Sequence, residues 1–205
     1  ERLVGSVHVA ILELIKNAYD ADATEVRISA DRSSEGTVTV VEDNGSGMNF
    51  DQVRKYWMKI ATTNKVEQSI SKKYGRPKSG AKGIGRFSCR RLGTLLTLET
   101  TAEYSPGKFQ TTCLRINWKD FVAGTSLSKV EVEYNTQERS SGKKGTILRI
   151  TSPNAELLTD KSVSYIKRHS TILVANRGIH RKGFEPDPGF NLSFPFFGKQ
   201  DDNFS

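Results

Sequence analysis

The chain has 205 residues, of which 36% are hydrophobic and 26% charged, and its formal net charge is +8. This length suits one large domain, or one domain with an appendage, and it can bury a core without disulfides. No apolar run reaches membrane-spanning length and no signal sequence opens the chain, so we expect a soluble cytoplasmic protein with no membrane partner. Its cysteines, Cys89 and Cys113, lack metal-ligand spacing and are expected to be reduced.

Positive charge is concentrated in one part of the sequence. Residues 54–91 contain 12 Lys or Arg and a single acid, Glu67, whereas the rest of the chain has a small acidic excess. A basic surround raises the local concentration of phosphate groups. A solvated basic loop and a nucleic-acid surface are the alternatives. All three interpretations stay open at this point.

The first regular segment runs from Val4 to about Ala21, where apolar residues recur at helical spacing. Glu13, Asn17 and Asp20 share a different face of this predicted helix, because they are four and three residues apart. We therefore expect the helix to pack against a sheet and to turn its polar stripe toward a site.

Strands are predicted next around Val26–Ile28 and Val38–Val41, followed by a helix at 49–60. Residues 61–80 are polar, show no sustained period and form a stretch long enough to be a functional loop. The remaining predicted elements are a helix at 84–92, strands at 94–101, 109–117, 126–134 and 146–151, and a helix at 159–175. This order favours an α+β fold: a two-layer sandwich with helices on one face of a mixed, mainly antiparallel sheet.

Three segments in a fixed order carry the chemistry: Glu13–Ala21, Glu42–Met48 and Gly80–Ser88. The first supplies a carboxylate and an amide on a helix. The second supplies an aspartate at a strand end with glycines after it. The third is a glycine-rich turn entering a helix, where bare backbone amides suit phosphate oxygens. It is not a Walker loop, because no Gly-Lys-Ser/Thr closes it, and no strand precedes it as a Rossmann turn requires.

The content and order of these segments resemble the GHKL ATPases, which include the DNA gyrase B subunit, the ninety-kilodalton heat-shock chaperone, histidine kinases and MutL. The resemblance runs from about Val4 to Ile150. It implies a Bergerat-type ATP-binding fold at 1–175 with an ATP lid at about 61–82. Residues 176–205 are rich in Gly, Pro and Phe and are expected to be an irregular appendage or a lead into a further domain.

The resemblance also implies roles for single residues. Glu13 matches the general base that orients or deprotonates a water, and Asn17 matches the ligand of Mg²⁺. Asp43 matches the carboxylate that accepts a hydrogen bond from the amino group of adenine and rejects the carbonyl of guanine. Asp22 has no role in this scheme, and we expect it at the surface. The other residues expected at the nucleotide are Asp20, Ala21, Gly45, Gly47, Met48, Lys65, Lys82, Gly83, Ile84, Gly85, Arg86, Phe87 and Thr146.

We therefore expect an ATPase that takes ATP and Mg²⁺, and that closes its lid to form an ATP-dependent homodimer or to engage a nucleic-acid or protein partner. Family members take a phosphate-contacting Lys or Arg from a following domain, so we expect slow hydrolysis from this chain alone. The long lysine-rich lid is closer to MutL, MORC or related bacterial ATPases than to histidine kinases. The alternatives are a nucleic-acid module that uses the basic lid and Arg168–Lys182, and a nucleotide sensor without turnover.

Overall fold

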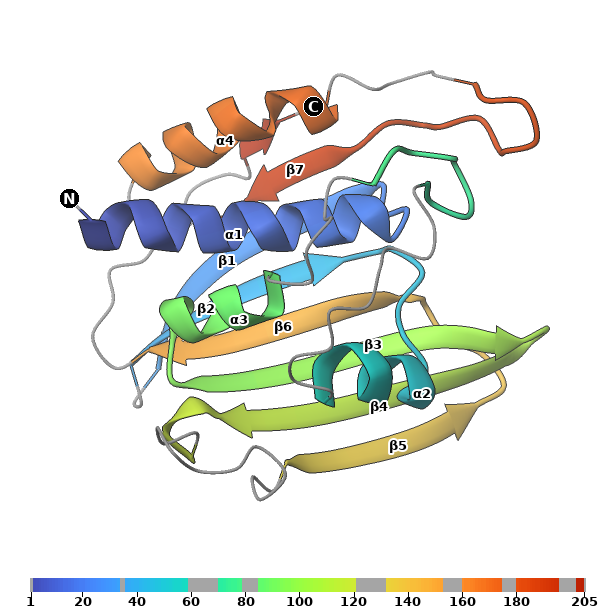
Figure 1. The fold of residues 1–205 in the computed structure, drawn as a ribbon, viewed down its shortest axis with the longest axis horizontal. Coiled ribbons are helices and arrows are strands. Elements are labelled where there is room, and N and C mark those ends of the chain that lie inside the picture. The colour runs from blue at the N-terminus through green and yellow to red at the C-terminus, as the bar shows by residue number, and fades with distance from the viewer. Residues whose placement is uncertain are drawn as a thin grey trace.

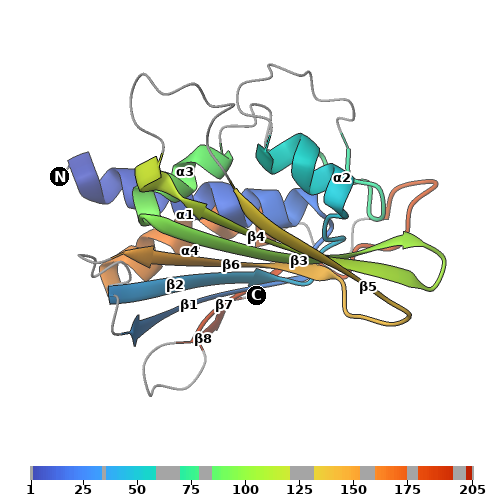
Figure 2. The same cartoon turned by 90° about the horizontal axis from the view of Figure 1, so that it is seen from below.

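The computed structural model describes residues 2–33, 36–58, 70–78, 85–120, 132–152, 160–174, 180–195 and 202–204. In this part of the chain the helices lie on one face of a single sheet (Figures 1 and 2). The expected α+β sandwich is thereby confirmed. The helical elements are α1 (Arg2–Asp20), α2 (Phe50–Val53), the π-helical turn η1 (Arg54–Met58), α3 (Gly85–Leu92), the 3-10 turn η2 (Trp118–Asp120) and α4 (Asp160–Val174).

The described strands form one eight-stranded sheet in the order β5-β4-β3-β6-β2-β1-β7-β8. Neighbouring strands are antiparallel except β1 and β7, which are parallel, so the sheet is mixed. The strands are β1 (Glu25–Ser33), β2 (Gly36–Asp43), β3 (Leu95–Ser105), β4 (Lys108–Asn117), β5 (Glu133–Arg139), β6 (Gly145–Ser152), β7 (Asn191–Phe194) and β8 (Asp202–Phe204).

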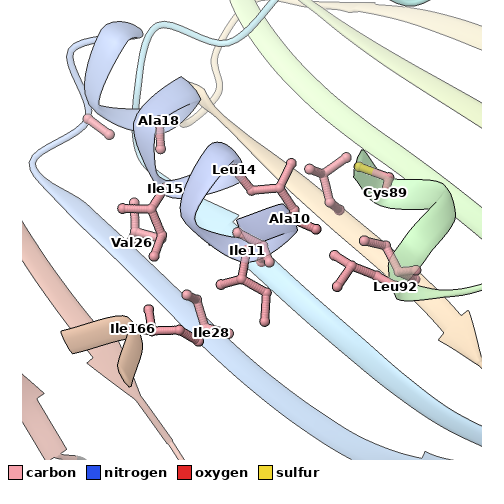
Figure 3. Close-up of a cluster of buried hydrophobic side chains, with 14 of the residues drawn as sticks. Ala10, Ile11, Leu14, Ile15, Ala18, Val26, Ile28, Cys89, Leu92 and Ile166 are labelled. Atoms are coloured by element: carbon pink, nitrogen blue, oxygen red, sulfur yellow. The ribbon is translucent and has the colours of Figure 1, made fainter. Parts of the chain in front are cut away.

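The core lies between α1 and the helix-facing side of the sheet (Figure 3). The apolar side chains of α1 are buried at intervals of three and four, as its sequence pattern predicts, and a fully buried Ile or Leu stabilises the fold by roughly 1.5–3 kcal/mol. They meet residues of β1, α3 and α4. The buried residues labelled in Figure 3 are Ala10, Ile11, Leu14, Ile15, Ala18, Val26, Ile28, Cys89, Leu92 and Ile166.

The tail differs from its expectation. Residues 191–194 are not irregular but form β7, which pairs in parallel with β1 through Glu25↔Asn191 and Val26↔Leu192. Leu192 and Phe194 of this short strand are buried. The irregular tail expected from the sequence is wrong at these residues, because the polar/apolar alternation of β7 covers only four residues within a Gly- and Pro-rich stretch and its partner strand lies far away in sequence.

Two other boundaries differ from the sequence-based expectations. Of the strand expected at 126–134, residues 126–131 lie outside the described part of the chain, and β5 runs from Glu133 to Arg139. Its side chains are all exposed, so no buried alternation marked its position in the sequence. The helix expected at 49–60 begins after Asn49, whose side chain accepts a hydrogen bond from the Gln52 amide, and it widens into η1.

Candidate functional site

Three of the expected site residues, Glu13, Asn17 and Asp20, lie on α1. Glu13 and Asn17 are one helical turn apart, and Asn17 is exposed. The Oε1 atom of Glu13 accepts a hydrogen bond from Lys16 Nζ at 2.9 Å, with 27% of the Glu13 side chain exposed. A pair that is partly exposed to solvent in this way is worth on the order of 1 kcal/mol, so the carboxylate is not locked in this contact.

Asp43 ends β2 directly opposite Thr146, the second residue of β6. Its Oδ1 accepts a hydrogen bond from the Gly45 amide at 2.9 Å. Burial raises the pKa of Asp43 to about 6, against the lowering effect of the Gly45 and Thr146 amides, and the charge of Glu42 raises it further. The structure therefore holds a carboxyl group in one orientation at a strand end, in surroundings that disfavour its charge.

The turn after Asp43 is tied to the end of α1. The Ser46 amide donates to the Ala21 carbonyl at 2.8 Å. Asn44 Oδ1 accepts from the amides of Thr24 and Glu25 at 2.8 and 2.9 Å. These bonds bring two of the three sequence motifs together, although they are more than twenty residues apart in the chain.

Gly47 and Met48 continue this turn toward β3. Gly47 has a φ of +64°, and a Cβ there would overlap the Thr101 carbonyl, so only glycine fits. The Met48 amide donates to Thr100 Oγ1 at 2.9 Å, and the same hydroxyl lies 3.0 Å from Thr146 Oγ1. Thr100 is fully buried and thus connects Met48 to Thr146.

Several of the residues expected on the nucleoside side come together from distant segments. A connected set of contacts links Ala21, Asp43, Gly45, Met48 and Thr146. Asp20 is the last residue of α1, one position before this set. Glu13 lies eight residues before Ala21, which is about 12 Å along a helix axis.

The expected phosphate side is described only in part. Gly85 is the first residue of α3, which packs beside α1. The structure describes the backbone of Arg86 and Phe87 within α3 but not the positions of their side chains. Lys65, Lys82, Gly83 and Ile84 lie outside the described residues, as does most of the lid at 61–82.

Asp22 and Arg76, for which the sequence predicted no such role, bind residues 70–78, the described part of the lid, to the rest of the fold. Asp22, expected at the surface without a role, accepts hydrogen bonds from the Lys73 and Tyr74 amides at 2.8 and 3.2 Å. Arg76, counted in the basic run, is fully buried and forms a bidentate pair with Asp187 at 2.8 and 2.7 Å. No sequence signal pairs Arg76 with Asp187, which lies 111 positions later.

The donor chemistry around Asn17 fits the ion that the sequence implies. Among the described residues no cluster of three or more His, Cys, Asp or Glu forms a metal cage. Mg²⁺ needs none, because it keeps several waters and takes phosphate oxygens from its nucleotide. The exposed amide oxygen of Asn17, one turn from the Glu13 carboxylate, is a suitable single protein ligand.

Replacing Asp43 with asparagine should change how stability depends on pH. The folded-state pKa of Asp43 is raised to about 6. Between pH 4 and 7 the carboxyl therefore ionises less readily in the folded state than in the unfolded state, which lowers the unfolding free energy of wild type. Asp43→Asn has no such group and keeps its stability. The unfolding free energy of the variant should therefore rise relative to wild type by on the order of 1–3 kcal/mol across this range. Denaturant titrations from pH 4 to 8 measure it. Asp31→Asn, at an exposed position of β1, should run parallel to wild type, and a parallel profile for Asp43→Asn would contradict the raised pKa.

The chain is similar to a known protein family and to a curated protein. The family model "Histidine kinase-, DNA gyrase B-, and HSP90-like ATPase" matches residues 5–146. A curated protein from Herpetosiphon aurantiacus, named "Putative type II restriction enzyme HgiDII", is 39% identical over 85 residues. The aligned part is 42% of this chain but only 13% of that protein, so the chain spans a small part of its relative. No described helix is long and apolar enough to cross a membrane.

Proposed function

The chain belongs to the histidine kinase-, DNA gyrase B- and HSP90-like ATPase family, and we propose that it binds ATP with Mg²⁺ and hydrolyses it slowly. Membership of the family supports ATP binding. The proposal also includes turnover of ATP, closure of the lid and formation of a dimer. We further propose that the chain is closer to MutL, MORC or related bacterial ATPases than to histidine kinases.

The observation that carries the proposal is the position of Asp43. Its carboxyl is oriented by the Gly45 amide, and Asp43 pairs with Thr146 on the neighbouring strand β6. The Thr146 hydroxyl is linked through Thr100 to the Met48 amide. A fixed acceptor beside a threonine hydroxyl suits the amino edge of adenine, and the partly buried Met48 nearby in the chain offers an apolar side chain for its face. Guanine presents a carbonyl at that edge, which would leave the Asp43 carboxylate unpaired.

In the proposed hydrolysis step, Glu13 accepts the proton of the attacking water. The oxygen of a water attacks the γ-phosphorus of ATP, the bond to the β–γ bridging oxygen breaks, and ADP and inorganic phosphate leave. Glu13 orients this water and accepts its proton, which requires the carboxylate to move from Lys16 or to share that contact. Asn17 would hold Mg²⁺, which supplies charge neutralisation at the phosphates when bound.

The remaining expected residues act on the phosphates in this proposal. The start of α3 at Gly85 offers a helix N-terminus, and Gly83, Ile84, Arg86 and Phe87 would surround the phosphate groups. Lys65 and Lys82 would add positive charge from the lid. Closure of the lid over ATP would create the surface for a homodimer or a partner, and hydrolysis would release it.

A thermal-shift series with ATP, GTP and ADP, each with and without Mg²⁺, tests the binding proposal. A ligand that binds only the folded state at a hundred times its Kd stabilises by about 2.7 kcal/mol, which is roughly 5–11 °C for a chain of this size. We expect a shift with ATP and Mg²⁺ that GTP does not reproduce. Equal shifts with both nucleotides, or none with ATP, would reject the assignment of Asp43.

A second candidate function is association with nucleic acid. Residues 70–78 and 180–185 lie side by side, since the Glu185 amide donates to the Lys73 carbonyl at 3.1 Å. Together they expose Lys72, Lys73, Lys78 and Lys182, and the name of the HgiDII relative refers to a restriction enzyme. If four lysines contact duplex phosphates, raising the salt from 50 to 200 mM should weaken nucleic-acid binding roughly a hundredfold. Affinity for ATP should change far less over the same range.

A further inference from the structure

Arg76 has an environment unlike that of the other basic residues described near it. Its side chain is 0% exposed, and that of Asp187 is 1% exposed. The Nε and Nη2 atoms donate to the two carboxylate oxygens of Asp187 at 2.8 and 2.7 Å. The guanidinium also lies 4.6 Å from the ring centre of Tyr19 and 4.9 Å from that of Tyr74. A buried charge so completely paired occupies one defined position.

The other hydrogen bonds of Arg76 reach the last turn of α1, the turn that follows it, and the backbone of Gly189. Nη1 donates to the carbonyls of Ala23 at 2.5 Å and Tyr19 at 3.4 Å, and Nη2 donates to Gly189 at 3.0 Å. Tyr19 belongs to the last turn of α1, where the carbonyls carry partial negative charge, and Ala23 lies three residues beyond the helix end, so a guanidinium suits this place. Arg76 therefore binds the turn at residues 19–23, where α1 ends.

A second set of hydrogen bonds joins the same turn to residues 70–78, and here the turn supplies the side chain. Asp22 adopts a φ of +60°, and its carboxylate accepts the Lys73 and Tyr74 amides. The Arg76 side chain thus binds backbone carbonyls of the turn. In return, the Asp22 side chain of the turn binds the backbone amides of residues 73–74. These reciprocal bonds fix residues 19–23 against residues 70–78.

From this turn a short run of bonds reaches the site. Ala21 lies between Tyr19 and Ala23, its carbonyl accepts the Ser46 amide at 2.8 Å, and a Cβ on Gly45 would meet its carbonyl oxygen at 2.8 Å. Gly45 in turn donates to Asp43. A displacement of the turn at residues 19–23 would therefore move the groups that orient Asp43.

We propose that Arg76 is a positioning residue for the adenine end of the nucleotide site, held in place by Asp187. It acts through the carbonyls of Tyr19 and Ala23 and touches neither nucleotide nor metal itself. This inference rests on the proposed ATP binding. It extends the site's support to the segment around Asp187, which lies beyond the residues 5–146 matched by the family.

The test compares Arg76→Lys and Asp187→Asn with the wild-type chain. Arg76→Lys keeps the charge but cannot serve Asp187 and both carbonyls together, and Asp187→Asn keeps the shape but holds the guanidinium less firmly. We expect each variant to bind ATP about tenfold more weakly, at a temperature where circular dichroism shows it folded, and to lose preference for ATP over GTP. Hydrogen exchange at the Ser46 amide should become faster, while exchange at the Val53 amide, bonded to Asn49, should not change.

The matched control is Ile166→Ala, which removes a fully buried side chain from α4 and lowers stability without touching the turn. Its melting temperature should fall while ATP affinity, selectivity and Ser46 exchange stay as in wild type. If Arg76→Lys behaves like this control, Arg76 is only structural and the inference is overturned. If wild type itself does not bind ATP, the proposed function fails, and Ser46 exchange still decides whether Arg76 positions the turn.

Discussion

Replacing Glu13 with glutamine is expected to lower the rate of ATP hydrolysis by roughly 10²–10⁴-fold, which is the usual contribution of a general base. Glutamine keeps the size of the side chain but cannot accept the proton of the attacking water. ATP affinity should change little, because Glu13 acts on the water and not on the nucleotide. Single-turnover hydrolysis with protein in excess, beside equilibrium ATP binding, measures both quantities even when turnover is slow.

The contact with Lys16 sharpens the Glu13 experiment. Lys16 Nζ lies 2.9 Å from the Glu13 carboxylate, so Lys16→Met tests whether this pair restrains the base. Glu133→Gln, an exposed change at the far edge of the sheet on β5, serves as the control and should leave hydrolysis unchanged. Equal turnover in Glu13→Gln and wild type would instead support a nucleotide sensor without catalysis.

Replacing Asp187 with alanine is expected to destabilise the fold by about 3–5 kcal/mol, because it leaves the buried Arg76 guanidinium without its counter-charge. For a chain of this size the melting temperature should fall by roughly 6–20 °C. Chemical denaturation at neutral pH gives the free energy directly. A loss below about 1 kcal/mol would show that water or another group reaches Arg76 in the variant.

Acid should reduce the difference between this variant and wild type. Burial alone would raise the pKa of Asp187, but hydrogen bonds from Arg76 and the Gly189 amide outweigh it, and the pKa lies below its ordinary value. The stability from this group is therefore complete above about pH 4 and is lost as pH falls through the lowered pKa. Denaturation of both proteins should converge below pH 4.

Two further variants separate charge pairing from packing. Arg76→Met combined with Asp187→Ala removes the orphaned charge, so this double variant should be more stable than Asp187→Ala alone. Glu185→Ala breaks the exposed pair with Lys73, whose atoms are 3.5 Å apart, and should cost under about 1 kcal/mol. If the double variant is no more stable than the single one, packing and not charge dominates at this place.

Local sequence patterns predicted the elements whose cause is local. The apolar period of α1 describes a helix buried on one side, and its polar residues at intervals of three and four share another side. Likewise the alternating residues of β3 and β4 predict strands that lie where expected. Strand β7 is not predicted, because its alternation of polar and apolar residues is only four residues long and its pairing partner β1 lies far away in the chain.

The sequence by itself determined the family, the order of the three motifs and the place of Asp43 at a strand end, because motif content and periodicity depend on residues close together in the chain. Only the tertiary structure decided that Arg76 is buried, that Asp22 binds the segment at Lys73 and that Asp187 belongs to the same network. The physical reason is that a charged side chain is normally exposed and is buried only when the fold supplies a partner, which the local sequence does not reveal. Whether Arg76 is buried depends on where the fold brings a counter-charge 111 residues away.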